Sequence, residues 1–315
     1  MEEGRHPLMT ERVCVIVNPA AGRGRGARMV PEISSRFHEI GAADIRLTSS
    51  RGEESHIARA AIGEGFTTLV AVGGDGTTSN IANAILHSGA DVRLGVLPAG
   101  TGNDFAKVLG TSKAGIRTVA ELCFGAADVR VDAGRIEDRF FFNCCGFGFD
   151  VAVLEEIGRT PWLRGNSVYV YTALRQLFGY RGFNVAISSE RGTRPQSLHM
   201  LLVIANAAWF GGMFKIAPDA SITNGELDAV SILNIPAWRR IPMLAAATRG
   251  THIARPECRI DRAGSFEVSF EAPPSYEADG ELHHAASATV TVSSCPSVLR
   301  VVAGPGFSSR GSVSI

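Results

Sequence analysis

One stretch decides the fold of this chain: Leu69-Val70-Ala71-Val72-Gly73-Gly74-Asp75-Gly76-Thr77. Its apolar run predicts a fully buried strand. The glycines that follow predict a sharp turn whose backbone amides can lie close to a bound group. A helical pattern then begins at Thr77. A strand, a glycine turn and a helix N-terminus together form an anion site, because free N–H groups and the helix dipole point toward the ligand.

Asp75 lies on this predicted turn. A carboxylate there would repel a bare phosphate, but it suits a site that holds Mg²⁺ or transfers a phosphoryl group. Gly-Gly-Asp-Gly is also an ordinary turn sequence. The stretch alone therefore leaves open both a phosphate site and a plain turn.

Composition limits the class of protein. The chain has 315 residues, is 45% hydrophobic and is long enough for two domains. Lys+Arg and Asp+Glu number 31 each, and this balance argues against a nucleic-acid partner. No apolar run reaches the roughly 18 to 20 residues that span a bilayer, and the polar N-terminus lacks a hydrophobic signal core. We expect a cytoplasmic protein whose cysteines are reduced.

Strand and helix patterns alternate in a first domain, predicted for residues 10–133. The predicted strands are 13–17, 45–48, 69–72 and 93–97, and the predicted helices are 27–40, with Pro31 in its first turn, 53–63 and 77–86. Such alternation is typical of an α/β domain with a mostly parallel sheet and helices on both faces. Loops 18–22, 73–77 and 98–104 follow strand ends, so we expect them to converge on one site.

The pattern changes in a second domain, predicted for residues 134–295. The predicted strands are 140–143, 185–188, 198–205, 227–233, 265–270 and 289–293, with helices at 168–177 and 237–248. This pattern indicates an all-β domain, either a sandwich or a flattened barrel. A last strand at 298–302, within a segment 296–304, is expected to return to the first domain.

Taken together, the motifs resemble the diacylglycerol kinase catalytic family, bacterial lipid kinases related to sphingosine and ceramide kinases. The matching stretches keep the family's order and are residues 17–22, 73–77, 97–106, 131–134, 142–150, 214–218, 224–228 and 279–281. Any one of them is weak alone, whereas the ordered set is specific. The resemblance implies a nucleotide-binding α/β domain, a β-sandwich domain and an active site in the cleft between them.

The resemblance also implies a reaction, transfer of the γ-phosphoryl group of ATP to a lipid hydroxyl with Mg²⁺ as cofactor. Diacylglycerol is the first expected acceptor, and a sphingoid base or ceramide is the alternative. The ATP-binding positions carried over are Asn18, Pro19, Ala20, Ala21, Gly22, Thr48, Gly74, Asp75, Gly76, Thr77, Thr78, Ser79, Asn80 and Thr101. The sequence contains no G-x-x-x-x-G-K-[ST] motif, so glycine amides rather than a P-loop lysine would bind the phosphates.

Four carboxylates are candidates for the chemistry. The resemblance places Asp75, Asp104 and Asp132 near the transferred phosphoryl group, where they would organise Mg²⁺ and water. It makes Glu281 the general base that takes the proton of the lipid hydroxyl. Structural alternatives stay open: Asp104 as a helix cap, Asp132 as a turn residue and Glu281 as a solvated hairpin residue.

Two positions depart from the family pattern. An aspartate that binds a structural Mg²⁺ in the family is replaced here by Asn224, with Ser221 and Glu226 as the candidate carbonyl donors. An uncharged amide should bind the ion more weakly. In the first domain, Asn80 stands where the family carries a glutamate.

A lipid kinase must reach its substrate at an interface, and two segments mix tryptophan, arginine and aliphatic residues, 161–164 and 235–244. Both are candidates for transient peripheral contact with a membrane, although an ordinary packed helix is the alternative.

Among enzymes, the rival function is an NAD kinase, which shares Gly-Gly-Asp-Gly-Thr. A non-catalytic nucleotide- or lipid-binding sensor is a further alternative. The sequence leaves a homodimer open.

Overall fold

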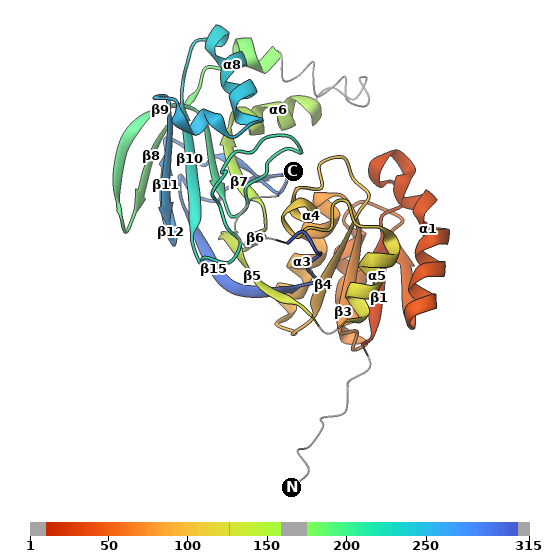
Figure 1. The fold of residues 1–315 in the computed structure, drawn as a ribbon. Coiled ribbons are helices and arrows are strands. Elements are labelled where there is room, and N and C mark those ends of the chain that lie inside the picture. Colours follow the sequence, from red (N-terminus) through yellow and green to blue (C-terminus); the bar gives the residue numbers. More distant parts are fainter. Residues whose placement is uncertain (1–10, 126, 159–174, 308–315) are drawn as a thin grey trace. The chain divides into compact units, whose positions relative to one another are not determined.

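The computed structural model describes residues 11–125, 127–158 and 175–307. The chain forms two units (Figure 1). Unit 1 comprises Met1–Thr101, Leu109–Val129 and Leu299–Pro305, and unit 2 comprises Gly102–Val108, Arg130–Val298 and Gly306–Ile315. No helix among the described residues is long and apolar enough to cross a bilayer.

A parallel sheet forms the centre of unit 1. Its strands are β1 (Val13–Val17), β2 (Ala43–Leu47), β3 (Thr68–Gly73) and β4 (Arg93–Pro98), in the order β4-β3-β1-β2. β1, β3 and β4 are buried along their whole length, as expected for apolar strands covered on both faces. The end of β15 (Thr289–Val301) adds a further parallel strand beside β4, where Arg300 pairs with Arg93. The predicted returning strand is confirmed.

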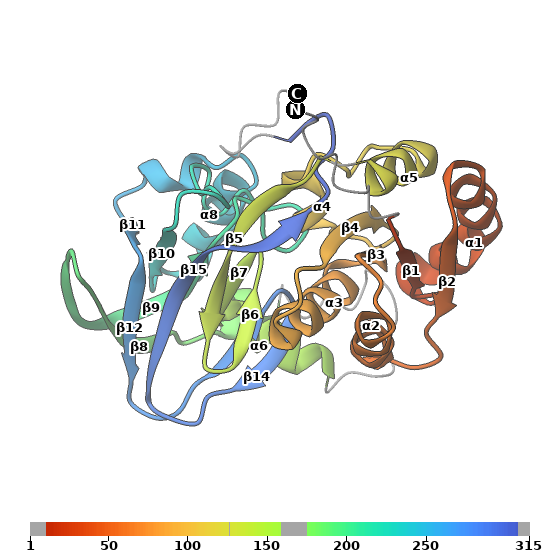
Figure 2. The ribbon, with the colours of Figure 1, turned by 90° about the horizontal axis from the view of Figure 1, so that it is seen from below.

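Helices cover both faces of this sheet (Figure 2). α1 (Ala21–Ile40) and α5 (Ile116–Phe124) share one face, where the rings of Phe37 and Phe124 lie 6.3 Å apart. α2 (Glu53–Gly63) and α3 (Asp75–Ser88) lie side by side on the other face. The predicted three-layer α/β domain is therefore confirmed.

The predicted start of the first helix is wrong. α1 begins at Ala21, and Gly22, Arg23 and Gly24 leave helical geometry before the helix resumes. Pro31 consequently lies inside the helix instead of in its first turn. Its exposed position allows water to solvate the carbonyl group that the missing N–H would have bound.

Unit 2 is built mainly of antiparallel strands. One path runs β14-β13-β7-β9-β8-β12-β15, β10 pairs with β9 and β11, and β5 pairs with β15 and β6. The bounds are β5 (Val129–Ile136), β6 (Arg139–Phe141), β7 (Cys144–Gly148), β8 (Phe183–Ser189), β9 (Gly192–Ala205), β10 (Leu227–Leu233), β11 (Cys258–Ala263), β12 (Ser265–Phe270), β13 (Ser275–Ala278) and β14 (Glu281–His284). The inner faces of these strands form one apolar core that includes Phe147, Leu202 and Phe266. The expectation of an all-β sandwich is confirmed.

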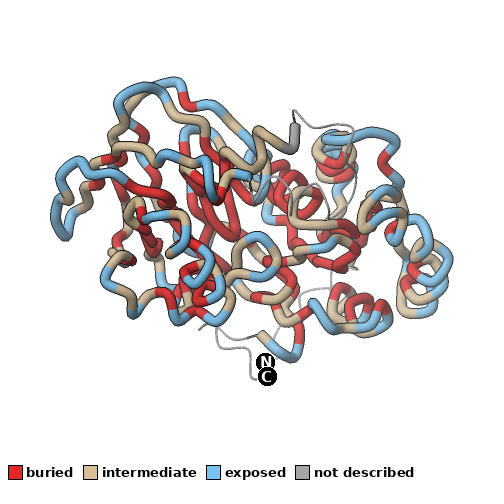
Figure 3. Tube along the Cα trace, turned by 90° about the horizontal axis from the view of Figure 1, so that it is seen from above, coloured by how far each residue is buried: buried red, intermediate tan, exposed pale blue. Residues whose placement is uncertain are grey.

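The helices of unit 2 with described bounds are α4 (Asp104–Val108), α6 (Phe149–Gly158) and α8 (Ala237–Ala247), and residues 175–179 are also helical. A 3-10 turn, η1 (Thr251–Ala254), follows α8. The buried residues lie along the centres of the strands and the inner faces of the helices in each unit (Figure 3). The predicted helix at 168–177 lies largely outside the described residues, and the 161–164 segment lies wholly outside them.

The predicted strand at 140–143 is wrong because two strands meet there. β6 ends at Phe141 and β7 begins at Cys144. The intervening N–H groups of Phe142 and Asn143 donate to the carboxylate of Asp279 instead of to a neighbouring strand. This break becomes important at the site described below.

Candidate active site

Two loops at the carboxyl ends of neighbouring strands lie against each other in unit 1. The N–H groups of Ala99 and Gly100, after β4, donate to the carbonyl oxygen of Gly73 at 2.8 and 3.0 Å. A Cβ on Gly74 would lie 3.4 Å from the Cα of Gly100. The sequence predicts this convergence, and the backbones of the two loops lie within van der Waals contact of each other.

The loop after β1 joins the same cluster. Asn18 donates through Nδ2 to Oγ1 of Thr77 at 3.1 Å, and its Oδ1 accepts the N–H of Ala20 at 3.0 Å. A Cβ on Gly22 would lie 2.1 Å from the carbonyl oxygen of Ala99, inside the contact distance of any real atom pair. All three predicted loops therefore meet in one glycine-lined cradle.

The chain is locally strained where this loop enters α1. Gly22, Arg23 and Gly24 all have left-handed backbones, with φ of 56°, 58° and 82°. Arg23 has a Cβ, and such a conformation costs roughly 1–2 kcal/mol for a residue other than glycine. Strain of this kind persists where the shape of a loop matters for function.

The N-terminus of α3 opens into the cradle. Its N-cap is Gly74, which has no side chain to cap the first turn. Gly74, Asp75 and Gly76 are partly accessible, whereas Thr77 and the residues after it are buried. The first turn of the helix therefore presents backbone N–H groups and one carboxylate, the combination needed to bind a metal-bound phosphate.

The other predicted ATP positions differ in accessibility. Thr78, Ser79 and Asn80 are buried, and their polar groups bond to neighbouring residues of unit 1. Thr48 is also buried, whereas Thr101 is exposed. Pro19, Ala20 and Ala21 retain partial or full exposure. The buried positions can support the cradle from behind, and their role in ATP binding stays a prediction.

Sequence reasoning missed one carboxylate behind α3. Glu54 on α2 is only 3% exposed, and its Oε1 accepts the Nδ2 of Asn80 at 3.0 Å. Its spacing from the buried Ala58 and Ala61 places it on the inward stripe of α2, and that spacing was the available signal. A carboxylate from α2 thus contacts the position where the resemblance led us to expect a glutamate.

Asp104 holds two segments of unit 2 together. Its Oδ1 accepts Nζ of Lys107 at 2.7 Å and its Oδ2 accepts the N–H of Gly212 at 2.8 Å. Lys107 also donates to the carbonyl oxygen of Gly212 at 2.6 Å. The carboxylate therefore fixes the loop around Gly212 to α4, and its role at the phosphoryl group stays a prediction.

Asp132 is likewise occupied by the backbone. It is 1% exposed, and its oxygens accept the N–H groups of Gly225 and Ser297, each at 2.7 Å. These are the contacts of a residue that holds turns, the alternative that the sequence left open. Its role in organising Mg²⁺ stays a prediction.

The turn before Glu281 is tightly specified. Asp279 and Gly280 have φ of 49° and 84° and form a two-residue connection between β13 and β14. Left-handed pairs of this kind suit tight antiparallel hairpins. The carboxylate of Asp279 accepts the N–H groups of Phe142, Asn143 and Cys144 at 2.9, 2.8 and 3.3 Å. The turn is thereby attached to the break between β6 and β7.

Glu281 is the first residue of β14 and is held by an ion pair. Its Oε2 accepts Nη2 of Arg139 at 3.0 Å, and the two side chains are 21% and 19% exposed. The solvated hairpin residue considered from the sequence would be more exposed and free of such a partner. Arg139 was not singled out from the sequence, because nothing in its spacing connects it to a residue so far along the chain.

Comparison with known proteins identifies the family. Residues 12–136 match the diacylglycerol kinase catalytic domain, and residues 143–303 match the YegS C-terminal NAD kinase beta sandwich-like domain. The chain belongs to the diacylglycerol kinase catalytic family. It is a diacylglycerol kinase-like lipid kinase, a phosphotransferase.

Individual relatives are similar to this chain over nearly its whole length. A diacylglycerol kinase of Bacillus subtilis (strain 168) is 26% identical over 273 residues, which cover 86% of this chain and 90% of the relative. A solved diacylglycerol kinase of Bacillus anthracis str. Sterne has a TM-score of 0.72 at 19% identity, covering 95% of this chain and 98% of that one. An NAD kinase of Archaeoglobus fulgidus, solved with ATP, has a TM-score of 0.53 at 13% identity, covering 93% and 94%. At these identities the two solved structures confirm the fold alone.

The structural Mg²⁺ site, Asn224 with the carbonyl groups of Ser221 and Glu226, stays a prediction, and the side chains around it are already engaged. Oδ1 of Asn224 accepts the N–H of Glu226 at 3.1 Å, and the Glu226 carboxylate pairs with Arg191. Nearby, Arg262 donates to Oδ1 of Asp228 at 2.6 Å. The described residues contain no group of three or more His, Cys, Asp or Glu side chains able to hold a metal. Two guanidinium groups thus supply the positive charge around this loop.

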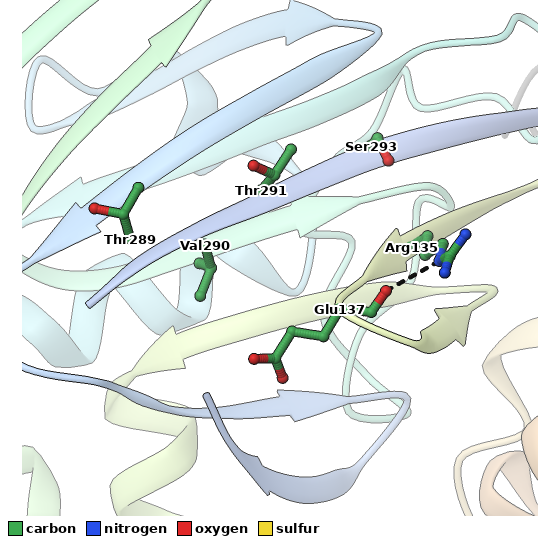
Figure 4. A pocket seen from close by; sticks show the side chains of 6 residues that line it. All are labelled: Arg135, Glu137, Thr289, Val290, Thr291 and Ser293. Atoms are coloured by element: carbon green, nitrogen blue, oxygen red, sulfur yellow. Dashed lines mark hydrogen bonds between the residues drawn. The ribbon is translucent and has the colours of Figure 1, made fainter. Parts of the chain in front are cut away.

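A pocket of about 320 Å³ lies in unit 2 (Figure 4). It is lined by Arg135, Glu137, Thr289, Val290, Thr291 and Ser293. Five of these six side chains are polar, and Glu137 is already bonded to the hydroxyl of Tyr276 at 3.1 Å. The lining does not suit an acyl chain, so this pocket is no candidate for the lipid of the kinase.

Proposed function

We propose that this lipid kinase transfers the γ-phosphoryl group of ATP to a hydroxyl group of diacylglycerol, forming phosphatidic acid. The observation that carries the proposal is the glycine-lined cradle of unit 1, in which the three family loops meet at the uncapped N-terminus of α3. The name of the Bacillus subtilis relative supports the choice of acceptor.

The residues that line the cradle have the following proposed roles in ATP binding. The N–H groups at the start of α3 and the loops after β1 and β4 bind the phosphates of ATP. Asp75, partly accessible in the first turn of α3, fits an oxygen-ligated Mg²⁺ and would hold it together with phosphate oxygens. When bound, Mg²⁺ would neutralise part of the negative charge of the phosphates. Asn18 fixes the first loop to Thr77 and so keeps the cradle in shape.

Glu281 serves as the general base. A lipid hydroxyl is a weak nucleophile, and its oxygen attacks the γ-phosphorus more readily as its proton passes to a carboxylate. The bond from the γ-phosphorus to ADP breaks as the bond to the lipid oxygen forms. Arg139 holds the carboxylate in one orientation for this step.

The lipid must be taken from a membrane surface, and part of the 235–244 segment suits contact with one. Trp238 and Ile241 on α8 are 72% and 51% exposed, and Phe178 is 63% exposed. Arg240 does not contribute, because it is buried and donates to the carbonyl oxygens of Leu177 and Ile235. We propose transient contact through the exposed apolar side chains.

The test is transfer of label from γ-labelled ATP, with Mg²⁺, into detergent-dispersed pools of diacylglycerol, sphingoid base, ceramide or NAD. We expect labelled phosphatidic acid from the wild type and a loss of at least 100-fold with Glu281→Gln, while ATP binding persists. Label in another lipid pool would change the acceptor, and label in NAD alone would overturn the proposal. ATP binding without any transfer would indicate a sensor.

A further inference from the structure

Two buried carboxyl groups lie against the same glycine in unit 2, apart from the groups assigned above. A Cβ placed on Gly146 of β7 would lie 1.8 Å from Oδ2 of Asp150 and 2.9 Å from Oε1 of Glu277. Asp150 is the second residue of α6, and Glu277 lies on β13, directly opposite Gly146 in the sheet. Only a glycine leaves room for both carboxyl groups on this face of β7.

Neither acid is neutralised by a cation in the described part of the chain. Asp150 and Glu277 are 8% and 1% exposed. The oxygens of Asp150 have no hydrogen-bond partner among the described residues, although amides in the first turn of α6 lower its pKa in part. Oε1 of Glu277 accepts a hydrogen bond from the thiol of Cys144, whose Sγ lies 3.6 Å away. Two adjacent ionised carboxylates without a counter-ion are not stable in such surroundings.

Glu277 also contacts the turn that carries the proposed base. Its Oε2 accepts the N–H of Gly280 at 2.7 Å. Gly280 directly precedes Glu281, so the position of the Glu277 carboxyl group is transmitted to the base through a single residue. The adjacent Asp279 holds the other side of this turn.

We propose that Asp150 and Glu277 share one proton across Gly146, and that this acid pair positions the Asp279-Gly280 turn and with it Glu281. This inference rests on the proposed function of Glu281. The shared proton converts repulsion between two buried carboxylates into a hydrogen bond, and Oε2 of Glu277 keeps its bond to the N–H of Gly280. Asp150 and Glu277 are positioning residues, because neither is assigned a contact with substrate.

The pair makes the turn dependent on pH. Burial raises the pKa of Asp150 to about 7, and burial together with the charge of Asp150 raises the pKa of Glu277 well above its usual range. The titratable groups facing the pair from neighbouring segments are Asp279, Tyr180, Cys144 and Cys145, none of them cationic. Raised values mean that the folded state binds the proton more tightly than the unfolded chain. The stabilisation is complete below the unfolded pKa of about 4 and is lost as the pH rises through about 7 and above.

The experiment compares wild type, Asp150→Asn, Asp150→Ala and Glu277→Gln over pH 5 to 9, by Tm and by kcat with saturating ATP. An amide cannot ionise, so we expect Asp150→Asn to abolish the alkaline fall in Tm. We also expect it to extend the alkaline limb of kcat by roughly one pH unit, with KM for ATP unchanged. For Asp150→Ala we expect kcat to fall at least tenfold. For Asp150→Asn we expect most of the wild-type kcat to remain. Asp261→Asn, on β11, is the matched control and should titrate like the wild type.

The outcomes separate this inference from the proposed function. If Asp150→Asn and Glu277→Gln both keep the wild-type fall in Tm with pH, the shared proton is disproved whatever the activity. If the fall disappears but Glu281→Gln still transfers phosphoryl groups at the wild-type rate, the proton pair stands and the assignment of the base fails. Should Asp150→Asn not fold, Glu277→Gln alone decides the Tm comparison.

Discussion

Arg139 and Glu281 form a partly buried ion pair whose Nη2 and Oε2 atoms are 3.0 Å apart, although 142 positions separate them in the sequence. β6 carries the arginine, and β14 begins with the glutamate. A carboxylate held this way has fewer rotamers than a free one. The pair therefore reduces the entropy that the proposed base would lose when it meets its substrate.

Removing the arginine should impair chemistry more than nucleotide binding. For Arg139→Gln we expect kcat to fall about tenfold, equivalent to about 1.4 kcal/mol in the activation barrier, with KM for ATP unchanged. Arg139→Lys should retain part of the rate because the charge remains. Steady-state kinetics with Arg135→Gln as control, on the neighbouring strand β5, measure the effect. An equal change in KM for ATP would show that Arg139 acts on the nucleotide instead.

The cradle should be intolerant of a single methyl group. In Gly22→Ala, the new Cβ meets the carbonyl oxygen of Ala99 at 2.1 Å and the backbone remains left-handed. We expect ATP affinity to fall at least tenfold, because the loop must move out of the cradle. Gly63→Ala is the control, since nothing lies within 4 Å of its Cβ position at the end of α2. Calorimetric ATP titration compares the two, and equal affinities would show that the loop is not part of the nucleotide site.

The buried bond between Glu54 and Asn80 should contribute to the stability of unit 1. Asn80→Ala leaves the Glu54 carboxylate without its 3.0 Å donor and should lower the free energy of unfolding by about 1–3 kcal/mol. Adding Glu54→Gln should recover part of this loss, because a neutral amide is easier to bury. Denaturant unfolding of the single and double variants measures the coupling. Strictly additive effects would rule out a direct interaction.

Mg²⁺ alone should not stabilise the loop around Asn224. Arginines already pair with Glu226 and Asp228, so we expect the Tm of the nucleotide-free wild type to stay within 1 °C up to about 10 mM Mg²⁺. Asn224→Asp restores a charged ligand and should make Tm rise with Mg²⁺. Scanning calorimetry at several Mg²⁺ concentrations tests both. A comparable rise in the wild type would mean that a metal site persists without the aspartate.

Membrane contact should depend on the exposed face of α8. Trp238→Ser should reduce co-sedimentation with vesicles containing diacylglycerol and anionic phospholipid by roughly fivefold, because it removes the largest exposed apolar side chain of that helix. Leu198→Ser, at a 44% exposed position on β9, is the matched control. Equal sedimentation of both variants and the wild type would place the contact elsewhere.

Local patterns predicted much of the fold for identifiable reasons. β1, β3 and β4 are continuous apolar runs ending in glycine or proline loops, so both their type and the clustering of their loops followed from the sequence. β13 and β14 were missed because each has only four residues and mixes polar with apolar side chains. The start of α1 was missed because left-handed residues at Gly22 to Gly24 resemble an ordinary loop.

Candidate site residues could be named where motifs are local, but their distant partners could not. Asn18, Asp75 and Glu281 could be named because each belongs to a short recognisable motif, and their roles stay predictions. The partners that hold Glu281 and its turn, Arg139 and Glu277, act across strand pairings that no spacing reveals. Asp104 and Asp132 show the converse, since a motif identified them but both accept backbone N–H groups, and Asp104 also pairs with Lys107.

β15 has a consequence for how the protein is made. Its residues from Thr289 belong to the sandwich strands, yet Arg300 and Val301 complete the edge of the parallel sheet beside β4. During synthesis the ribosome releases β1 to β4 about two hundred residues before this edge strand exists. Until then the backbone of β4 is an open edge able to pair with another nascent chain. A fragment ending near Val129 should therefore aggregate more readily than the full chain.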